Sequence, residues 1–155
     1  MAIANTVAAY LHARRIPYEL IMHPYRETAR QVAESAHVPP AQVAKAVILS
    51  DSRGGYVMAV IPSDCHVNLD EISRRAGRRL ELAPEMRVTP VFTDCASGAV
   101  PPIGPAYGME TMVDDALVGL SEIYFESGDH RGLIHVSGDQ FLSLLREASH
   151  GWFAH

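Results

Sequence analysis

Hydrophobic positions near the N-terminus follow a helical pattern and then an extended one. Residues 3–11 carry apolar side chains at helical spacing, which predicts an amphipathic helix that Pro17 ends. Residues 18–22 then predict a strand. Residues 28–31, Thr-Ala-Arg-Gln, have the spacing of a capping box, which indicates a short helix to about Ala36.

Two hairpins are the clearest extended features of the pattern. Residues 46–50 and 56–61 are apolar and β-branched, and residues 51–55 between them, Asp-Ser-Arg-Gly-Gly, are typical of a turn. Both strands are apolar almost throughout, so we expect both faces of this hairpin to be covered. A second hairpin pairs residues 122–126 with 133–136.

The remaining pattern completes a mixed order of elements. Capping-box patterns at 68–71 and 137–140 predict two further helices, while 80–83 and 111–113 predict short strands. Residues 95–108 are expected to form a loop. The order helix, strand, helix, hairpin, helix, strands, helix predicts a mixed α/β (α+β) fold with a largely antiparallel sheet flanked by helices.

Composition fits one soluble domain over residues 1–155. Hydrophobic residues make up 48% of the chain and charged residues 20%, as in ordinary globular proteins. No apolar run is long enough for a membrane span, and the N-terminus lacks a signal-peptide pattern. Two cysteines are too few for a disulfide framework, so we expect a cytoplasmic protein without a membrane partner.

Charge limits the class of partner. The formal net charge is −5 and no helix shows a basic recognition face, so DNA binding is not expected. Four arginines nevertheless fall close together: Arg74, Arg75, Arg78 and Arg79. This group is compatible with a solvated helix face and equally with a patch that contacts phosphates.

Lys45 is the only lysine beside twelve arginines. It lies in an apolar stretch, residues 43–49, where a charge added only for solubility is not normally found. A lysine at the start of a buried strand can hold a phosphate or polarise an ester carbonyl. The alternative is a side chain that extends off the strand end into water.

The loop Gly98-Ala-Val-Pro-Pro-Ile-Gly104 is the strongest local signal of a site. Its glycines allow a ligand to approach the backbone, and its prolines stiffen the residues before them. A rigid loop with fixed N–H groups suits a carbonyl or an oxyanion. The same pattern is also compatible with a purely structural turn.

Other reactive residues give weaker signals. Cys95 could act as a nucleophile if a base lay beside it, or it could be a half-buried inert thiol. The eight histidines show no metal-ligand spacing, so no metal site is predicted. The chain also lacks a Gly-x-Ser-x-Gly elbow and a P-loop, which argues against serine-hydrolase and nucleotide-hydrolysis chemistry.

With these motifs in view, the chain resembles the YbaK/EbsC family, also described as the prolyl-tRNA-synthetase-associated editing domain. The resemblance covers residues 1 to about 146. Its pieces keep the family's order and spacing: His23-Pro24 with Thr28-Ala29, Gln42 to Leu49, Asp94 to Gly104, Val113 to Asp115, Tyr124 to His130, and Phe141 to Leu145.

The resemblance implies a curved, barrel-like sheet and hydrolysis of the ester that joins a wrong amino acid to the tRNA 3′ end. Such trans-editing needs no cofactor and no protein nucleophile, because the vicinal ribose hydroxyl is thought to help activate water. The implied partner is the 3′ acceptor end of mischarged tRNA, and an aminoacyl-tRNA synthetase is a further candidate partner.

Site residues follow from the same resemblance. Lys45 would engage the terminal adenosine or its phosphate, and the amides between Gly98 and Pro101 would hold the aminoacyl carbonyl. The implied catalytic positions are Lys45, Gly98, Ala99, Val100 and Pro101. The implied substrate-binding positions are His23, Ala46, Asp129 and His130. Ala46 departs from the polar residue that many relatives carry, so the edited amino acid is left open.

Two rival hypotheses accompany this interpretation. One is an inactive adaptor that binds tRNA or a synthetase, which deacylation of a mischarged tRNA at catalytic enzyme levels would exclude. The other is a hydrolase that depends on Cys95, which predicts that Cys95→Ala abolishes activity.

Overall fold

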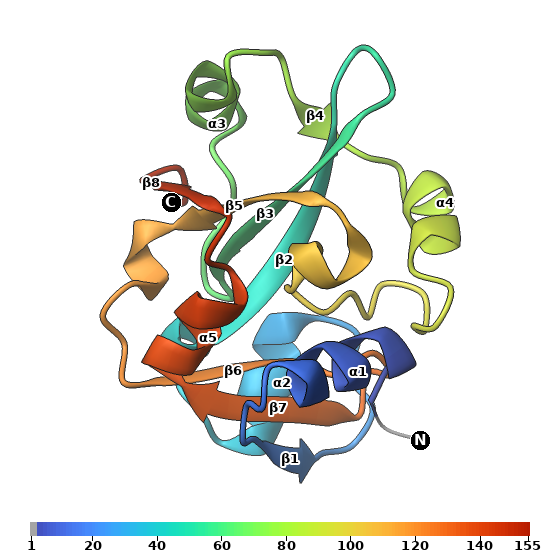
Figure 1. Ribbon diagram of the computed structural model, residues 1–155, viewed down its shortest axis with the longest axis vertical. Helices are drawn as coiled ribbons and strands as arrows, with labels where there is room; N and C mark the ends of the chain where they lie inside the picture. The colour runs from blue at the N-terminus through green and yellow to red at the C-terminus, as the bar shows by residue number, and fades with distance from the viewer. Residues whose placement is uncertain (1–2) are drawn as a thin grey trace.

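The computed structural model describes residues 3–155 and contains one mixed eight-stranded sheet (Figure 1). Its strands run in the order β1-β7-β6-β2-β3-β5-β8, and β4 pairs separately with β2. The strand bounds are β1 (Glu19–Met22), β2 (Val43–Ser50), β3 (Tyr56–Pro62), β4 (Glu81–Leu82), β5 (Glu110–Asp114), β6 (Glu122–Glu126), β7 (Gly132–Ser137) and β8 (Ser149–Gly151).

The five helices are α1 (Asn5–Ala13), α2 (Ala29–Ala36), α3 (Leu69–Ala76), α4 (Glu85–Val88) and α5 (Gly138–Leu144). Four of the five helices begin near the positions that the sequence pattern predicts, and α4 lies in a segment, residues 84–92, whose pattern is ambiguous. Both halves of a capping box are present at Thr28 and at Ser137, while Asn68 caps α3 by accepting the Glu71 N–H. Within residues 3–155, no helix is long and apolar enough to cross a membrane.

The strand pairings confirm the mixed α/β fold. The two predicted hairpins, β2–β3 and β6–β7, are antiparallel, as are β1–β7 and β2–β4. Three pairings are parallel: β2–β6, β3–β5 and β5–β8. Local periodicity did not predict β8 or the parallel pairings, because they join segments far apart in the sequence.

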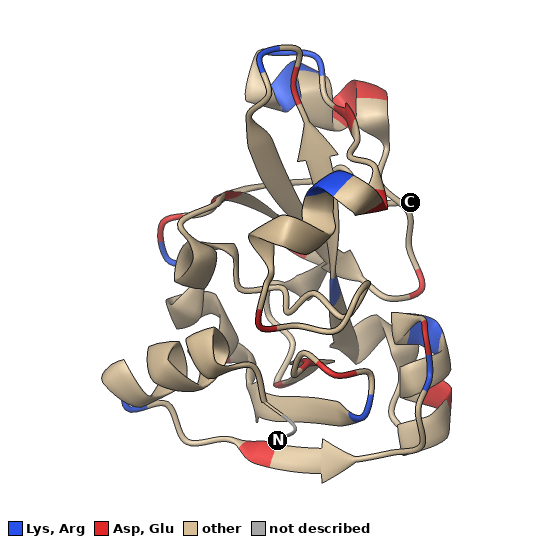
Figure 2. Ribbon diagram, turned by 90° about the vertical axis from the view of Figure 1, so that its right-hand side faces the viewer, with Lys and Arg blue, Asp and Glu red and all other residues tan. Residues whose placement is uncertain are grey.

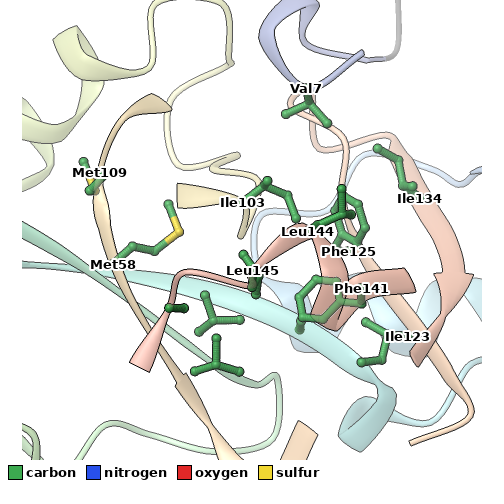
Figure 3. Packing of buried hydrophobic residues seen from close by; sticks show 14 of the residues in the cluster. Val7, Met58, Ile103, Met109, Ile123, Phe125, Ile134, Phe141, Leu144 and Leu145 are labelled. Atoms are coloured by element: carbon green, nitrogen blue, oxygen red, sulfur yellow. The ribbon is translucent and has the colours of Figure 1, made fainter. Parts of the chain in front are cut away.

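One face of the sheet packs against α1 and α5. Val7 of α1 and Phe141 and Leu144 of α5 are buried against Ile123 and Phe125 of β6 (Figure 3). Figure 1 shows both helices in front of β6 and β7. Side chains alternate between faces along each strand, so the neighbours of these residues point to the other side.

Two smaller clusters cover the opposite face. Near α2, Val32 and Ala33 pack against Val43 and Leu133. Near α3, a second cluster includes Ile72 and Leu49 of β2, and the partly buried Val47 packs against it. Both faces of the β2–β3 hairpin are therefore covered, as its apolar pattern predicts.

A gap along one edge of β2 positions the functional site. β6 pairs with β2 only at Val43 and Ala44, and β4 rejoins the same edge at Leu49 and Ser50. Within the described chain, no strand lies beside this edge at 45–47. On the α2 and α3 side, Lys45 lies between Val43 of the α2 cluster and Val47, which packs against the α3 cluster, while Ala46 packs against the main core on the other face.

Candidate functional site

A cavity of about 470 Å³ opens at this gap. Five segments supply its walls: the start of α2, the start of β2, the loop after β3, the glycine–proline loop and the β6–β7 hairpin. Its lining residues include Thr28, Arg30, Lys45, Ala46, Ser63, Asp64, His66, Gly98, Val100, Glu126 and His130. The size is in the range of small-molecule sites.

Lys45 places a half-buried ammonium in the cavity wall. Its Nζ donates to the carbonyl oxygen of Ser63 at 3.4 Å. Burial lowers the pKa of Lys45, although the nearby Cys65 and Asp64 oppose that shift. Ser63 is itself fixed, since its N–H donates to the Val43 carbonyl at 2.7 Å. The strand thus holds a cation whose desolvation would be relieved by an anionic or carbonyl ligand.

The glycine–proline loop is held rigidly beside this cation. Gly98 has φ +80°, a left-handed conformation that alanine adopts at a cost. The Ala99 N–H already donates to the Ala96 carbonyl at 2.9 Å. Among residues 3–155, the N–H groups of Gly98 and Val100 have no such partner, and both residues line the cavity. These two amides are the loop's candidate donors to a ligand oxygen.

His130 fixes the orientation of this loop. Its Nε2 lies 2.7 Å from the Ser97 carbonyl, and that oxygen can only accept, so Nε2 carries the proton. Because a peptide unit is planar, this bond also sets the direction of the Gly98 N–H. His130 is buried and adopts φ +63°, which is uncommon for a residue other than glycine.

Two carboxylates hold the hairpin turn that carries His130. Oε2 of Glu126 accepts the N–H groups of Gly128, Asp129 and His130 at 2.8, 3.2 and 3.1 Å. Oδ1 of Asp129 accepts those of Arg131 and Gly132, both at 2.9 Å. The turn is therefore preorganised by the protein and does not depend on a ligand for its shape.

The structure brings together five of the nine residues expected at the site. Lys45, Ala46, Gly98, Val100 and His130 all line the cavity. The other four lie outside its lining. Ala99 and Pro101 are buried in the loop behind it, Asp129 supports the hairpin turn, and His23 lies beside that turn.

His23 is tied to the hairpin by its backbone. Its N–H donates to the Arg131 carbonyl at 2.9 Å, while its Nδ1 donates to the Pro24 carbonyl at 2.7 Å. Its Nε2 is buried without a hydrogen-bond partner in the described chain. His23 is thus placed to support the turn from behind, and contact with a ligand remains a prediction.

Sequence reasoning missed several wall residues. Ser63, Asp64 and His66 follow β3 in a loop without any recognisable motif. Glu126 and Thr28 lie within motifs that resemble the family's, but the sequence assigned neither of them a role at the site. The capping box gave a usable signal for the position of α2, but nothing local indicated that its first turn faces Lys45.

Cys95 lies outside the cavity lining. Its Sγ lies 3.3 Å from the Tyr107 hydroxyl and 3.5 Å from Oδ1 of Asp94. Burial raises the pKa of Cys95 to about 12. The thiol is therefore protonated near neutral pH, and this geometry speaks against its use as a nucleophile.

The four clustered arginines face carboxylates. Arg74 and Arg75 pair with Glu71, Arg78 pairs with Asp51 and Glu110, and Arg79 pairs with Glu81. The Arg78 pairs measure 3.1 and 2.8 Å, and the Arg75 pair 2.9 Å. Figure 2 shows blue and red segments side by side at the end of the molecule that holds α3 and the β2–β3 turn.

Over residues 3–155, no three His, Cys, Asp or Glu side chains gather as metal ligands.

Comparison with known proteins identifies the family. Residues 23–144, most of the chain and all of the cavity lining, match the aminoacyl-tRNA editing domain. The chain belongs to the aminoacyl-tRNA editing domain family. This confirms the resemblance seen in the sequence motifs. No curated protein matches this editing domain.

Solved structures share the fold of this editing domain. The crystal structure of hypothetical protein APE2540 matches with a TM-score of 0.86 and 23% identity, over 97% of this chain and 100% of that one. A proposed trans-editing enzyme for prolyl tRNA synthetase matches with a TM-score of 0.81 and 21% identity, over 98% and 96%. At these identities the likeness concerns the fold alone.

Proposed function

We propose that this editing domain hydrolyses the ester of mischarged aminoacyl-tRNA as a freestanding enzyme. The observation that carries the proposal is the position of the Lys45 ammonium in one cavity with the free amides of Gly98 and Val100. The two fixed N–H groups can donate to the ester carbonyl, and the ammonium can bind the adjoining phosphate. Membership of the aminoacyl-tRNA editing domain family supports aminoacyl-tRNA as the substrate class.

In this proposal, water attacks the aminoacyl carbonyl and the amides stabilise the resulting oxyanion. The ester C–O bond then breaks, the water oxygen stays with the amino acid, and a proton returns to the ribose oxygen. The vicinal ribose hydroxyl assists the attacking water. Positioning and a preorganised oxyanion site can supply much of the acceleration for so reactive an ester. No cofactor and no protein nucleophile are needed.

The charges of the wall suit both ends of this substrate. Lys45 offers a cation to the terminal phosphate and ribose, and Glu126 offers a carboxylate to the α-ammonium group. Arg30 also lines the wall, where its Nε lies 3.8 Å from Oε1 of Glu34 in an exposed pair. Within the described residues, Oε2 of Glu126 accepts three backbone hydrogen bonds from the hairpin turn, which leaves Oε1 for such a ligand. In the wall, Ala46 limits the amino acid by shape, since its methyl group cannot hydrogen-bond.

Direct deacylation tests this function. Purified protein is incubated at catalytic levels with tRNAs charged with Ala, Ser, Thr, Cys or Pro, beside Lys45→Ala. We expect hydrolysis of one or a few of these and a loss of at least tenfold in Lys45→Ala. Absence of hydrolysis by the wild-type protein in every case would overturn the enzymatic proposal and favour an adaptor that only binds tRNA or a synthetase.

A further inference from the structure

An exposed aromatic ring lies at the border of the cavity. Tyr25 is 44% exposed, and its ring centroid lies 5.1 Å from that of His130. The guanidinium carbon of Arg131 lies 5.6 Å from the same Tyr25 ring centroid. The Arg131 guanidinium lies over the Tyr25 ring and the His130 ring is tilted by 55° against it, so Tyr25 is an exposed aromatic residue paired with an exposed cation rather than a core residue.

Arg26 adds a second cation to this surface. The backbone N–H of Arg26 donates to the His130 carbonyl at 3.3 Å, and its guanidinium Nη1 donates to the Tyr25 carbonyl at 2.7 Å. Arg26 and Arg131 are both exposed, and neither forms an ion pair with a carboxylate in the part of the chain that the structure describes. We call Tyr25, Arg26 and Arg131 the Tyr25 surface.

The Tyr25 surface is continuous with the cavity at two points. His130, whose ring contacts Tyr25, lines the cavity. Along the chain, Glu27 and Thr28 follow Arg26 directly and line the cavity as well. A ligand that fills the cavity and continues outward along this side therefore meets an aromatic face and two unpaired cations.

We propose that the Tyr25 surface binds the unpaired nucleotides that precede the terminal aminoacyl nucleotide of tRNA. One base stacks on Tyr25, while Arg26 and Arg131 contact the phosphates on either side. This inference rests on the proposed function, which places the terminal nucleotide in the cavity. Stacking on an aromatic ring beside basic side chains is the usual way in which proteins hold single-stranded RNA without reading its sequence.

Binding of RNA that carries no amino acid tests the proposal independently of catalysis. The probe is a fluorescently labelled RNA hairpin with an unpaired 3′-ACCA end, and a second hairpin lacks that end. Tyr25→Leu keeps the apolar bulk but loses the aromatic face, whereas Tyr25→Phe keeps the face. We expect Tyr25→Leu to raise the Kd for the first hairpin about tenfold and Tyr25→Phe to stay within twofold of wild type. Thermal unfolding verifies that both variants fold.

The blunt hairpin serves as the internal control. Because it has no unpaired bases to stack, Tyr25→Leu should bind it within twofold of the wild-type protein. A Kd of Tyr25→Leu for the ACCA hairpin within twofold of wild type would overturn the proposal. So would equal losses on both hairpins, or a wild-type protein that binds the ACCA hairpin no better than the blunt one.

Salt dependence tests the arginines. The logarithm of the association constant falls linearly with the logarithm of the salt concentration. Removing one phosphate contact to a single strand decreases the magnitude of that slope by about 0.7. We expect that decrease for Arg131→Gln and no change for Arg79→Gln, whose side chain is 84% exposed. The segment between α3 and β4, which contains residue 79, lies at the opposite end of the molecule from β1 and β7 (Figure 1). Equal slopes for Arg131→Gln and wild type would overturn the role of Arg131.

The two proposals fail in different ways. The hairpins carry no ester, so their binding does not depend on hydrolysis. A protein that binds the ACCA hairpin through Tyr25 but hydrolyses no charged tRNA contradicts the proposed function and supports this surface. A protein that hydrolyses charged tRNA but is indifferent to Tyr25→Leu in binding supports the function and contradicts the surface.

Discussion

Two groups of arginines in this molecule differ in what surrounds them. Arg74, Arg75, Arg78 and Arg79 are close in sequence, and each lies against a carboxylate. Arg26 and Arg131 are far apart in sequence, yet the pairing of β1 with β7 brings their segments together without a carboxylate partner. The first group is conspicuous in the sequence, and the second becomes visible only in the fold.

The comparison shows that a cluster of arginines in the sequence is not the same as a group of arginines free to bind a phosphate. An arginine already paired with a carboxylate has to give up that partner before it can bind a phosphate. Within the paired group, Arg78 connects the segment after α3 with the β2–β3 turn and β5, so its effect is on stability. The unpaired group borders the cavity, so its effect is on binding. The predictions below concern these two ends of the molecule.

The largest expected contrast is between two glycines of similar conformation. Gly98 has φ +80° and Gly77, which follows α3, has φ +72°. Alanine in this conformation costs about 1 kcal/mol at either position. At Gly98 the new methyl group would also lie 3.4 Å from Oε1 of Glu85 and 3.7 Å from Cε1 of His130, whereas at Gly77 it meets nothing within 4 Å.

Any change of φ that relieves the strain in Gly98→Ala turns the residue-98 N–H away from the ligand oxygen, so kcat/KM for deacylation should fall by up to roughly 100-fold, the effect of losing one oxyanion donor. Gly77→Ala should lose comparable stability in thermal unfolding but keep wild-type activity within twofold. Equal activities of the two variants would show that the geometry of the Gly98 loop has no role in the reaction.

A smaller effect is expected at the paired end. Arg78 contacts Asp51 at 3.1 Å and Glu110 at 2.8 Å, so Arg78→Ala removes two ion pairs. We expect a loss of about 1 kcal/mol, or roughly 2–4 °C in Tm, without a change in deacylation. Arg79→Ala is the matched control, because its single pair at 3.5 Å is exposed and should contribute little. An activity loss in Arg78→Ala would contradict the division between the two ends.

The smallest effect concerns the stability cost of Lys45. Burial lowers the pKa of Lys45 in the folded state, so its charge destabilises the fold at neutral pH. Lys45→Met should therefore raise stability at pH 7 by about 0.5 kcal/mol, or roughly 1–2 °C in Tm. As the pH rises from the lowered pKa toward 10.5, the unfolded chain binds more protons and wild-type stability rises. The gap should then shrink, and a gap that widens with pH would contradict this assignment.

The elements of the fold could be predicted because their signals are local. The capping boxes at Thr28 and Ser137 both form, and the turn at 51–55 joins the two strands expected on either side. The parallel pairing of β2 with β6 could not be predicted, since it rests on only two residue pairs between segments far apart in sequence. That short pairing is what leaves the edge of β2 open.

The site could be predicted in part for the same reason. Lys45 and Gly98 were recognisable from an unusual residue in an apolar strand and a glycine–proline loop. Ser63, Glu126 and Tyr25 carry no such mark, because each becomes relevant only through its position beside another segment. Asp129 lies outside the cavity lining, where its Oδ1 stabilises the hairpin turn, and its expected contact with the substrate stays a prediction.

The most direct test compares deacylation of one mischarged tRNA by wild type, Lys45→Met and the double variant Arg78→Gln with Arg79→Gln. If the cavity is the centre of activity, Lys45→Met loses at least tenfold in kcat/KM, as Lys45→Ala does, while remaining folded, and the arginine variant stays within twofold of wild type. Full activity in Lys45→Met, or a comparable loss in the arginine variant, would contradict the account.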